Sequence, residues 1–115
     1  MWLRLYVDCD ETLVTWHAGN KFLQEPVPNS LVVKFVQDWA AERGPDSVLV
    51  WAEASEQWAR TCATLALPGL ADRLACSAKF ELPLRPGDVF LDNDPYPMHS
   101  SQALHPRLLQ KVTRA

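Results

Sequence analysis

The hydrophobic and polar positions of the chain divide it into short strands that alternate with helices. Three runs are dense in apolar and β-branched residues, at 3–7, 48–51 and 89–91, and polar or turn-forming residues bound each of them. Short runs of this kind are typical of buried strands. The run at 48–51 has no alternation, which indicates a parallel sheet covered on both faces.

A first helix is predicted after Asn29 and Ser30, either of which can cap its start. Apolar side chains then recur at helical spacing: Leu31, Val32, Phe35, Val36, Trp39 and Ala40. The polar side chains face away from this stripe: Lys34, Gln37, Asp38 and Glu42. Gly44 and Pro45 follow, as expected just past a helix C-terminus, and they end the helix.

A second helix is predicted from Ser55, as its cap, to about Leu65. Its apolar face would consist of Trp58, Cys62 and Leu65. Pro68 and the glycine after it break this helix.

A small hairpin is predicted between the first strand and the first helix. Val14 and Trp16 would pair with Phe22 across a turn at Ala-Gly-Asn. The prolines Pro26 and Pro28 would then stop any strand, because proline has no N–H to donate to a sheet.

Weaker signals complete the pattern. They predict a helical turn at 70–74, a strand near 75–77, an edge strand at 102–104 and a final helix at 106–113. Strands that alternate with helices through short connections favour an α/β fold of three layers, Rossmann-like, with a mostly parallel sheet.

The composition limits the class of protein. The chain has 115 residues, about one domain, and 48% of them are hydrophobic, which excludes disorder. The net charge of −3 gives no general electrostatic reason to expect a nucleic-acid partner. Three cysteines without a Cys-x-x-Cys pair suit free thiols in a reducing compartment. The apolar residues before Asp8 are too few for a signal peptide, and no apolar run approaches the roughly 20 residues of a membrane span. We therefore expect a cytoplasmic protein with no membrane contact.

Acidic side chains stand where two of the predicted strands end. Asp8 and Asp10 follow the first strand, and Asp92 follows the strand at 89–91. The carboxyl ends of parallel strands form the edge where open α/β sheets bind ligands. If these two strands are neighbours, Asp8 and Asp92 converge on one point.

Carboxylates gathered at one point raise one another's pKa unless a cation neutralises them. Oxygen ligands without a nearby His or Cys select a hard cation, so Mg²⁺ is the cofactor we expect. Mg²⁺ held by two carboxylates keeps several waters and usually meets a phosphate. A carboxylate can also be a nucleophile and form an aspartyl-phosphate, with a second carboxylate as proton donor and acceptor.

These residues resemble two motifs of the haloacid dehalogenase (HAD) superfamily. Asp8-Cys-Asp-Glu-Thr-Leu-Val, after an apolar strand, is similar to the family's first motif, Asp-x-Asp-x-Thr. The residues of this segment most resemble those of the small phosphatases of the RNA polymerase C-terminal-domain type. Phe90-Leu-Asp-Asn resembles the family's fourth motif in its Asp-Asn form.

The resemblance implies a role for each matching residue. Asp8 would be the nucleophile and a metal ligand. Asp10 would be the general acid and base, with its backbone carbonyl on the metal. Asp92 would bind Mg²⁺, Thr12 would support the loop, and Asn93 would lie in the outer shell of the metal.

The chain departs from the family at the second motif. There the family has a Ser or Thr whose hydroxyl donates to the phosphoryl group, but this strand ends in Ala52. Losing one such donor costs on the order of 10²–10³ in rate. Ser55 can substitute if the loop bends back, or it can cap the helix. The backbone N–H groups of Glu53 and Ala54 remain as further donors.

The third motif of the family is a basic residue that balances the acids. Lys79 has a suitable position before the strand at 89–91, and Arg85 is its rival. Either side chain can instead be a solvated surface charge. Cys9 lies between two acids, so we expect it to point away from them into the core, and Asp94 suits a turn better than a metal site.

The resemblance implies one HAD-like domain over residues 1–115, without a large cap domain and with a short hairpin flap near 13–26. Its activity would be Mg²⁺-dependent phosphomonoester hydrolysis through an aspartyl-phosphate, with Asp8, Asp10 and Lys79 as catalytic residues. An open site would admit a bulky phosphorylated substrate, such as a protein or nucleic-acid end, unless a partner subunit covers it.

Two other classes of function stay open. A catalytically weak or inactive HAD-fold protein would bind a phosphorylated ligand or partner without turnover, and Ala52 favours this class. A small interaction module would use its acids only structurally.

Overall fold

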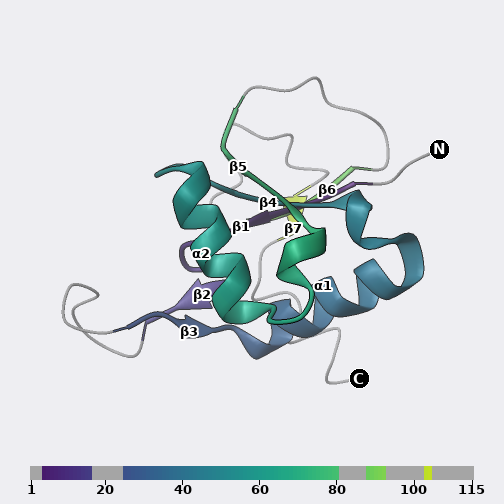
Figure 1. Cartoon of the computed structure of the whole chain (residues 1–115), viewed down its shortest axis with the longest axis horizontal. Helices are drawn as coiled ribbons and strands as arrows, with labels where there is room; N and C mark the ends of the chain where they lie inside the picture. The colour runs from purple at the N-terminus through teal and green to yellow at the C-terminus, as the bar shows by residue number, and fades with distance from the viewer. Residues whose placement is uncertain (1–3, 17–24, 81–87, 93–102, 105–115) are drawn as a thin grey trace.

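The structure, a computed structural model, describes residues 4–16, 25–80, 88–92 and 103–104 (Figure 1). No helix described in these ranges is long and apolar enough to cross a membrane. The elements are β1 (Leu5–Asp8), β2 (Val14–Thr15), β3 (Val27–Pro28), α1 (Ser30–Arg43), η1 (Pro45–Ser47), β4 (Val48–Ala52), α2 (Glu56–Ala66), η2 (Ala71–Arg73), β5 (Ala75–Ala78), β6 (Val89–Leu91) and β7 (Ala103–Leu104).

The main sheet has five strands in the order β5-β4-β1-β6-β7, and every neighbouring pair is parallel. The predicted α/β class with a parallel sheet is therefore confirmed. Strand β1 lies in the middle, with β4 on one side and β6 on the other. The chain moves outward from β1 to β4 and β5, and then places β6 on the opposite side of β1. The gap between β1 and β6 is thus a topological switch point, where open sheets bind ligands at their carboxyl ends.

The side chains of β1 alternate between the two faces of the sheet, as strand geometry requires. Leu5 and Val7 belong to the larger core, and Tyr6 belongs to a separate cluster on the other face. Asp8 is the last residue of β1, although the strand was expected to end at Val7. Alternation therefore places Asp8 on the face of Tyr6.

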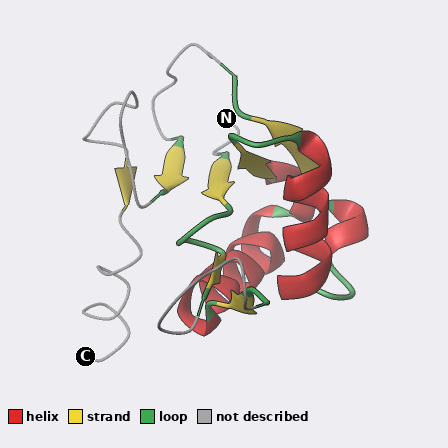
Figure 2. Cartoon of the chain, turned by 90° about the vertical axis from the view of Figure 1, so that its left-hand side faces the viewer, coloured by secondary structure: helices red, strands yellow, loops and turns green. Residues whose placement is uncertain are grey.

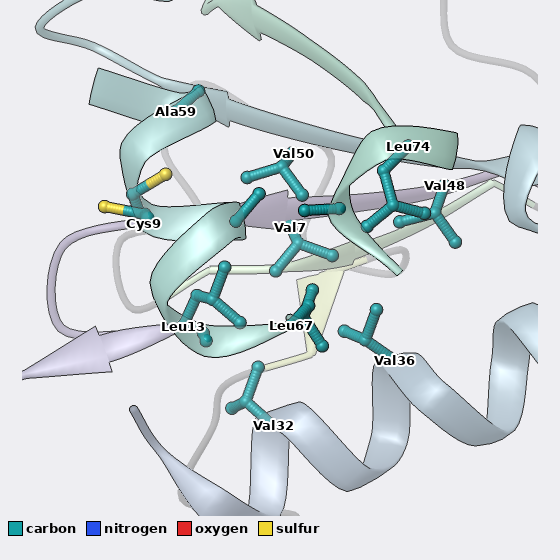
Figure 3. Packing of buried hydrophobic residues seen from close by; sticks show 14 of the residues in the cluster. Val7, Cys9, Leu13, Val32, Val36, Val48, Val50, Ala59, Leu67 and Leu74 are labelled. Atoms are coloured by element: carbon teal, nitrogen blue, oxygen red, sulfur yellow. The ribbon is translucent and has the colours of Figure 1, made fainter. Parts of the chain in front are cut away.

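Both helices cover the same face of the sheet, as Figure 1 and Figure 2 show. In Figure 3, Val7, Val48 and Val50 of the sheet lie opposite Leu67 and Val36. The described residues therefore form two layers, the sheet and the helices. The predicted third layer depends on the helix expected at 106–113, which lies outside the described residues.

Helix α1 has the predicted position and the predicted apolar stripe. Its most buried side chains are Val32, Val36, Trp39 and Ala40, and the expected polar positions are exposed. Asn29 stands at the N-cap, without a side-chain capping bond. Gly44 ends the helix with φ of 90°, a conformation that an L side chain rarely adopts.

The predicted apolar face of α2 is partly wrong. Its buried residues are small: Ala59, Cys62, Ala63 and Ala66. Leu65 is instead 43% exposed, and Trp58 is only half-buried. Large apolar side chains suggested the face, but the alanines mark the stripe that lies against β4 and β5.

Aromatic side chains cover the other face of the sheet. Tyr6 stacks on Phe90 with ring centroids 4.7 Å apart and packs against Trp51 at 5.0 Å. All three rings are buried. The hydroxyl of Tyr6 donates to buried Asp88 at 3.5 Å. The aromatic cluster lies on the face that carries Asp8.

The hairpin after β1 uses a different partner from the predicted one. Val14 pairs with Pro28 and Thr15 with Val27 in an antiparallel ladder of β2 and β3. The expectation that Pro28 prevents a strand is wrong, because a two-stranded ladder tolerates proline at an edge. The expected partner Phe22 lies outside the described residues.

The weaker predictions were largely confirmed. The turn at 70–74 is the short helix η2, the strand near 75–77 is β5, and the edge strand near 102–104 is β7. Strand β5 pairs in parallel with β4, from Leu49 opposite Ala75 to Ala52 opposite Ala78. This pairing sets the position of the residue that follows β5.

Candidate functional site

The register of the two central strands brings two acids together. Val7 of β1 is opposite Leu91 of β6, and the next residues are Asp8 and Asp92. Both side chains are buried, at 6% and 1% exposure. The expected convergence of the two strand ends is confirmed.

A lysine from the edge of the sheet joins these acids. Lys79 follows β5 directly, and its backbone N–H donates to the carbonyl of Ala52 at 2.9 Å. Its Nζ lies 3.1 Å from Asp8 Oδ1 and 2.9 Å from Asp92 Oδ2. Lys79 is therefore a residue of this site and no solvated surface charge, whereas Arg85 lies outside the described residues.

The electrostatics of the site follow from burial and from the two like charges. Burial, and then the charge of Asp92, raise the pKa of Asp8 to about 6, although Lys79 acts in the opposite direction. Burial alone would lower the pKa of Lys79, but the hydrogen bond to Asp92 and the charges of both acids outweigh it and raise that pKa. The Lys79 ammonium thus stays fully charged, and a second cation would further stabilise the two carboxylates.

The loop after β1 folds back on itself and holds Asp8. The hydroxyl of Thr12 donates to Asp8 Oδ2 at 3.3 Å. The N–H of Leu13 donates to the Asp8 carbonyl at 3.2 Å. Glu11, the residue before Thr12, has φ of 60°, which is uncommon for a residue other than glycine. Thr12 therefore lies where a supporting residue was expected.

Asp10 has a partner that the sequence did not indicate. The indole Nε1 of Trp58, on α2, donates to Asp10 Oδ1 at 2.9 Å. Trp58 was expected in the core, but its half-buried ring reaches the carboxyl edge of the sheet. One signal was present in the sequence: Trp58 lies in the first turn after the Ser55 cap, and that turn begins near the end of β4.

The structure also shows the surroundings of Ala52, which stands where the HAD pattern has a hydroxyl. Ala52 is buried in the core that faces the helices. Ser55 acts as the N-cap of α2, and its Oγ accepts from the N–H of Trp58 at 3.0 Å. The capping interpretation of Ser55 is confirmed. Glu53 and Ala54, between these residues, are exposed.

Cys9 has the orientation expected from alternation. It is fully buried in the larger core, among the apolar side chains that Figure 3 shows. A hydrogen bond with the thiol of Cys62, and then burial, raise the pKa of Cys9. A thiol of this kind stays protonated, so it is no nucleophile.

The donor set fits a hard cation. Among the described residues, no group of three or more His, Cys, Asp or Glu side chains is arranged to hold a metal ion. Two neighbouring carboxylates, Asp8 and Asp92, are nevertheless enough for Mg²⁺, which commonly uses one or two carboxylates, waters and a substrate phosphate. The raised pKa of Asp8 points the same way, because an added cation would relieve the repulsion between these acids. Asn93 and Asp94 lie outside the described residues.

Comparison of the chain with protein-family models, with curated proteins and with solved structures found no match. The chemistry of this chain is therefore inferred from four side chains and their arrangement: Asp8, Asp10, Lys79 and Asp92.

Proposed function

We propose that the chain is a HAD-type phosphatase that hydrolyses phosphomonoesters through an aspartyl-phosphate on Asp8. One observation carries the proposal: the Lys79 ammonium bridges Asp8 and Asp92 at the switch point of a parallel sheet, at 3.1 and 2.9 Å. A carboxylate that must attack a phosphoryl group needs cations near it, because both reactants are anionic. Lys79 supplies one such charge.

The first step transfers the phosphoryl group to the protein. A carboxylate oxygen of Asp8 forms a bond to phosphorus as the bond from phosphorus to the leaving oxygen breaks. Asp10 gives its proton to that oxygen, so an alcohol departs. General acid help of this kind is worth roughly 10²–10⁴ in rate.

The second step returns the protein to its starting state. Water attacks phosphorus and passes a proton to the Asp10 carboxylate as the bond to Asp8 breaks. Inorganic phosphate leaves, and Asp10 is again protonated. The sum is one phosphomonoester and one water converted to one alcohol and one phosphate.

Asp8 and Asp92, with the backbone carbonyl of Asp10, would hold Mg²⁺. When bound, Mg²⁺ supplies positive charge to the phosphoryl oxygens. Thr12 keeps one Asp8 oxygen oriented through its bond of 3.3 Å. The proposed protein is a capless member of the family, because β2 and β3 are the only elements described between β1 and α1 and the path from β4 to β5 carries only α2 and η2.

A second candidate is a HAD-fold protein that binds a phosphorylated ligand with little or no turnover. Ala52 favours it, because its methyl group is buried and offers no hydrogen bond. The nearest hydroxyl along the sequence, on Ser55, accepts the N–H of Trp58 as the cap of α2.

Hydrolysis of 4-nitrophenyl phosphate, with and without Mg²⁺, tests the proposal. We expect Mg²⁺-dependent turnover that Asp8→Asn abolishes. Activity that Asp8→Asn leaves intact would overturn the proposal. Mg²⁺ and phosphate binding without turnover would select the second candidate.

A further inference from the structure

The contact between Trp58 and Asp10 joins two segments far apart in the chain. The indole Nε1 lies 2.9 Å from Asp10 Oδ1, an ordinary distance for a well-formed hydrogen bond from an N–H to a carboxylate. Nothing in the HAD motifs requires a tryptophan here. We propose that Trp58 is a positioning residue that fixes the carboxyl of Asp10 for proton transfer to the leaving oxygen. This inference rests on the proposed function.

The chemistry of the indole gives the contact its direction. An indole N–H is a donor only, so it neither takes nor delivers the proton that Asp10 moves. A carboxyl that accepts this bond at Oδ1 carries its acid proton on Oδ2. Trp58 thus decides which oxygen faces the substrate and keeps the carboxyl plane from rotating. Rotation about this terminal bond is otherwise soft.

Both partners are held by their own surroundings. The backbone N–H of Trp58 donates to Ser55 Oγ at 3.0 Å, which fixes the first turn of α2. Its ring packs against the larger core. Asp10 lies in the loop whose Val14 N–H donates to the Cys9 carbonyl at 3.1 Å. The hydrogen bond therefore connects two elements that are each anchored to the core.

The start of α2 supplies a side chain to Asp10, the proposed acid. In the HAD pattern a hydroxyl at the end of the strand that corresponds to β4 donates to the phosphoryl group, whereas here the helix after β4 supplies an indole to the proposed acid. Proton transfer matters most when the leaving oxygen is a poor leaving group. The hydrogen bond from Trp58 should therefore raise the rate of hydrolysis more for esters of ordinary alcohols than for esters of acidic phenols.

Trp58→Phe tests this prediction, because it keeps an aromatic ring and removes the N–H. We expect kcat/KM for a primary alkyl phosphate to fall about tenfold or more, with a much smaller loss for 4-nitrophenyl phosphate. Trp39→Phe is the matched control. It also removes an indole hydrogen bond, from Trp39 Nε1 to Ser47 Oγ at 3.0 Å, but Ser47 precedes β4 at the opposite edge of the sheet. The ratio of the two kcat/KM values should not change in Trp39→Phe.

A second readout needs no turnover. In a ¹H–¹⁵N spectrum of the wild-type protein, NOE contacts to neighbouring protons assign the indole signal of Trp58. Asp10→Ala should move this signal upfield and leave the Trp39 signal in place. Because Asp10→Ala is a separate variant, this measurement does not depend on how well Trp58→Phe folds.

The outcomes separate the two proposals. Wild-type protein without Mg²⁺-dependent turnover would overturn the phosphatase and, with it, the proton transfer. Turnover with an equal loss on both substrates in Trp58→Phe would overturn the positioning role alone. A Trp58 indole signal that does not shift in Asp10→Ala would also overturn the positioning role.

Discussion

Lys79 and Asp92 form an ion pair of 2.9 Å although the strands that carry them, β5 and β6, are separated by β4 and β1 in the sheet. The long lysine side chain crosses the carboxyl ends of the two intervening strands. The same Nζ also lies 3.1 Å from Asp8 Oδ1. One ammonium group therefore serves two buried carboxylates.

Removing that ammonium should weaken the fold. Lys79→Met leaves Asp8 and Asp92 together without the lysine, and breaking a buried pair from one side costs on the order of 3 kcal/mol. We expect a loss of that size in the free energy of unfolding, measured with urea at neutral pH without divalent cations. Lys34→Met is the control, because Lys34 and Asp38 form an exposed pair, at 68% and 64% exposure, worth less than about 1 kcal/mol. Equal losses in the two variants would contradict the prediction.

The pH dependence of stability should carry the signature of Asp8. Its pKa rises from 3.8 to about 6 on folding, so between these values the folded protein holds a proton that the unfolded chain has released. This proton stabilises the fold fully below about pH 4, and the stabilisation disappears as the pH rises to about 6. Its full size is on the order of 3 kcal/mol. The quantity to measure is the difference in unfolding free energy between wild type and Asp8→Asn, without metal. That difference should fall over this pH range, and a constant value would refute the assignment.

Mg²⁺ should stabilise the folded protein. At a concentration ten times its Kd, a ligand that binds only the folded state adds about 1.4 kcal/mol. Asp92→Asn should remove most of this gain in a thermal unfolding experiment. Asp38→Asn, at an exposed position on α1, should keep it. A gain that survives Asp92→Asn would place the cation elsewhere.

Two leucines near the end of α2 test the corrected helix face. Leu67 is fully buried and Leu65 is 43% exposed. Leu67→Ala should lower the free energy of unfolding by about 2–5 kcal/mol, since it opens a cavity in the core. Leu65→Ala should change it by about 0.5 kcal/mol or less. Similar losses would restore the original assignment of Leu65 to the core.

The sequence alone predicted most of the described fold, because periodicity follows directly from which faces are buried. The strands at 48–51 and 89–91 and the helix after Asn29 could be recognised in this way. The α2 face could not, since large apolar side chains outweigh alanines in any count of hydrophobic residues. Pairing of Pro28 with Val14 also escaped prediction, because a proline signal does not reveal whether its ladder has a free edge.

The candidate site was predicted as far as strand ends and spacing determine it. Asp8 and Asp92 follow strands, so a parallel sheet must bring them to one edge. From the sequence, Lys79 and Arg85 were both candidates for the basic residue. The register of β5 with β4 is what places Lys79 at the site. The contact of Trp58 with Asp10 depends on how α2 is rotated about its axis, and single-residue patterns do not specify that rotation.

The site draws Asp8 from the end of β1, Lys79 from the residue after β5 and Asp92 from the residue after β6, so Asp8 is far from the other two groups in the chain. A partly folded chain that has joined only β1 and β4 already contains Asp8 and Asp10, but Lys79 and Asp92 are still absent from the edge. A cation held by Asp8 and Asp92 would therefore bind only after the strands on both sides of β1 are in place. The first appearance of such binding in a refolding experiment would mark the point at which β5 and β6 have both joined the sheet around β1.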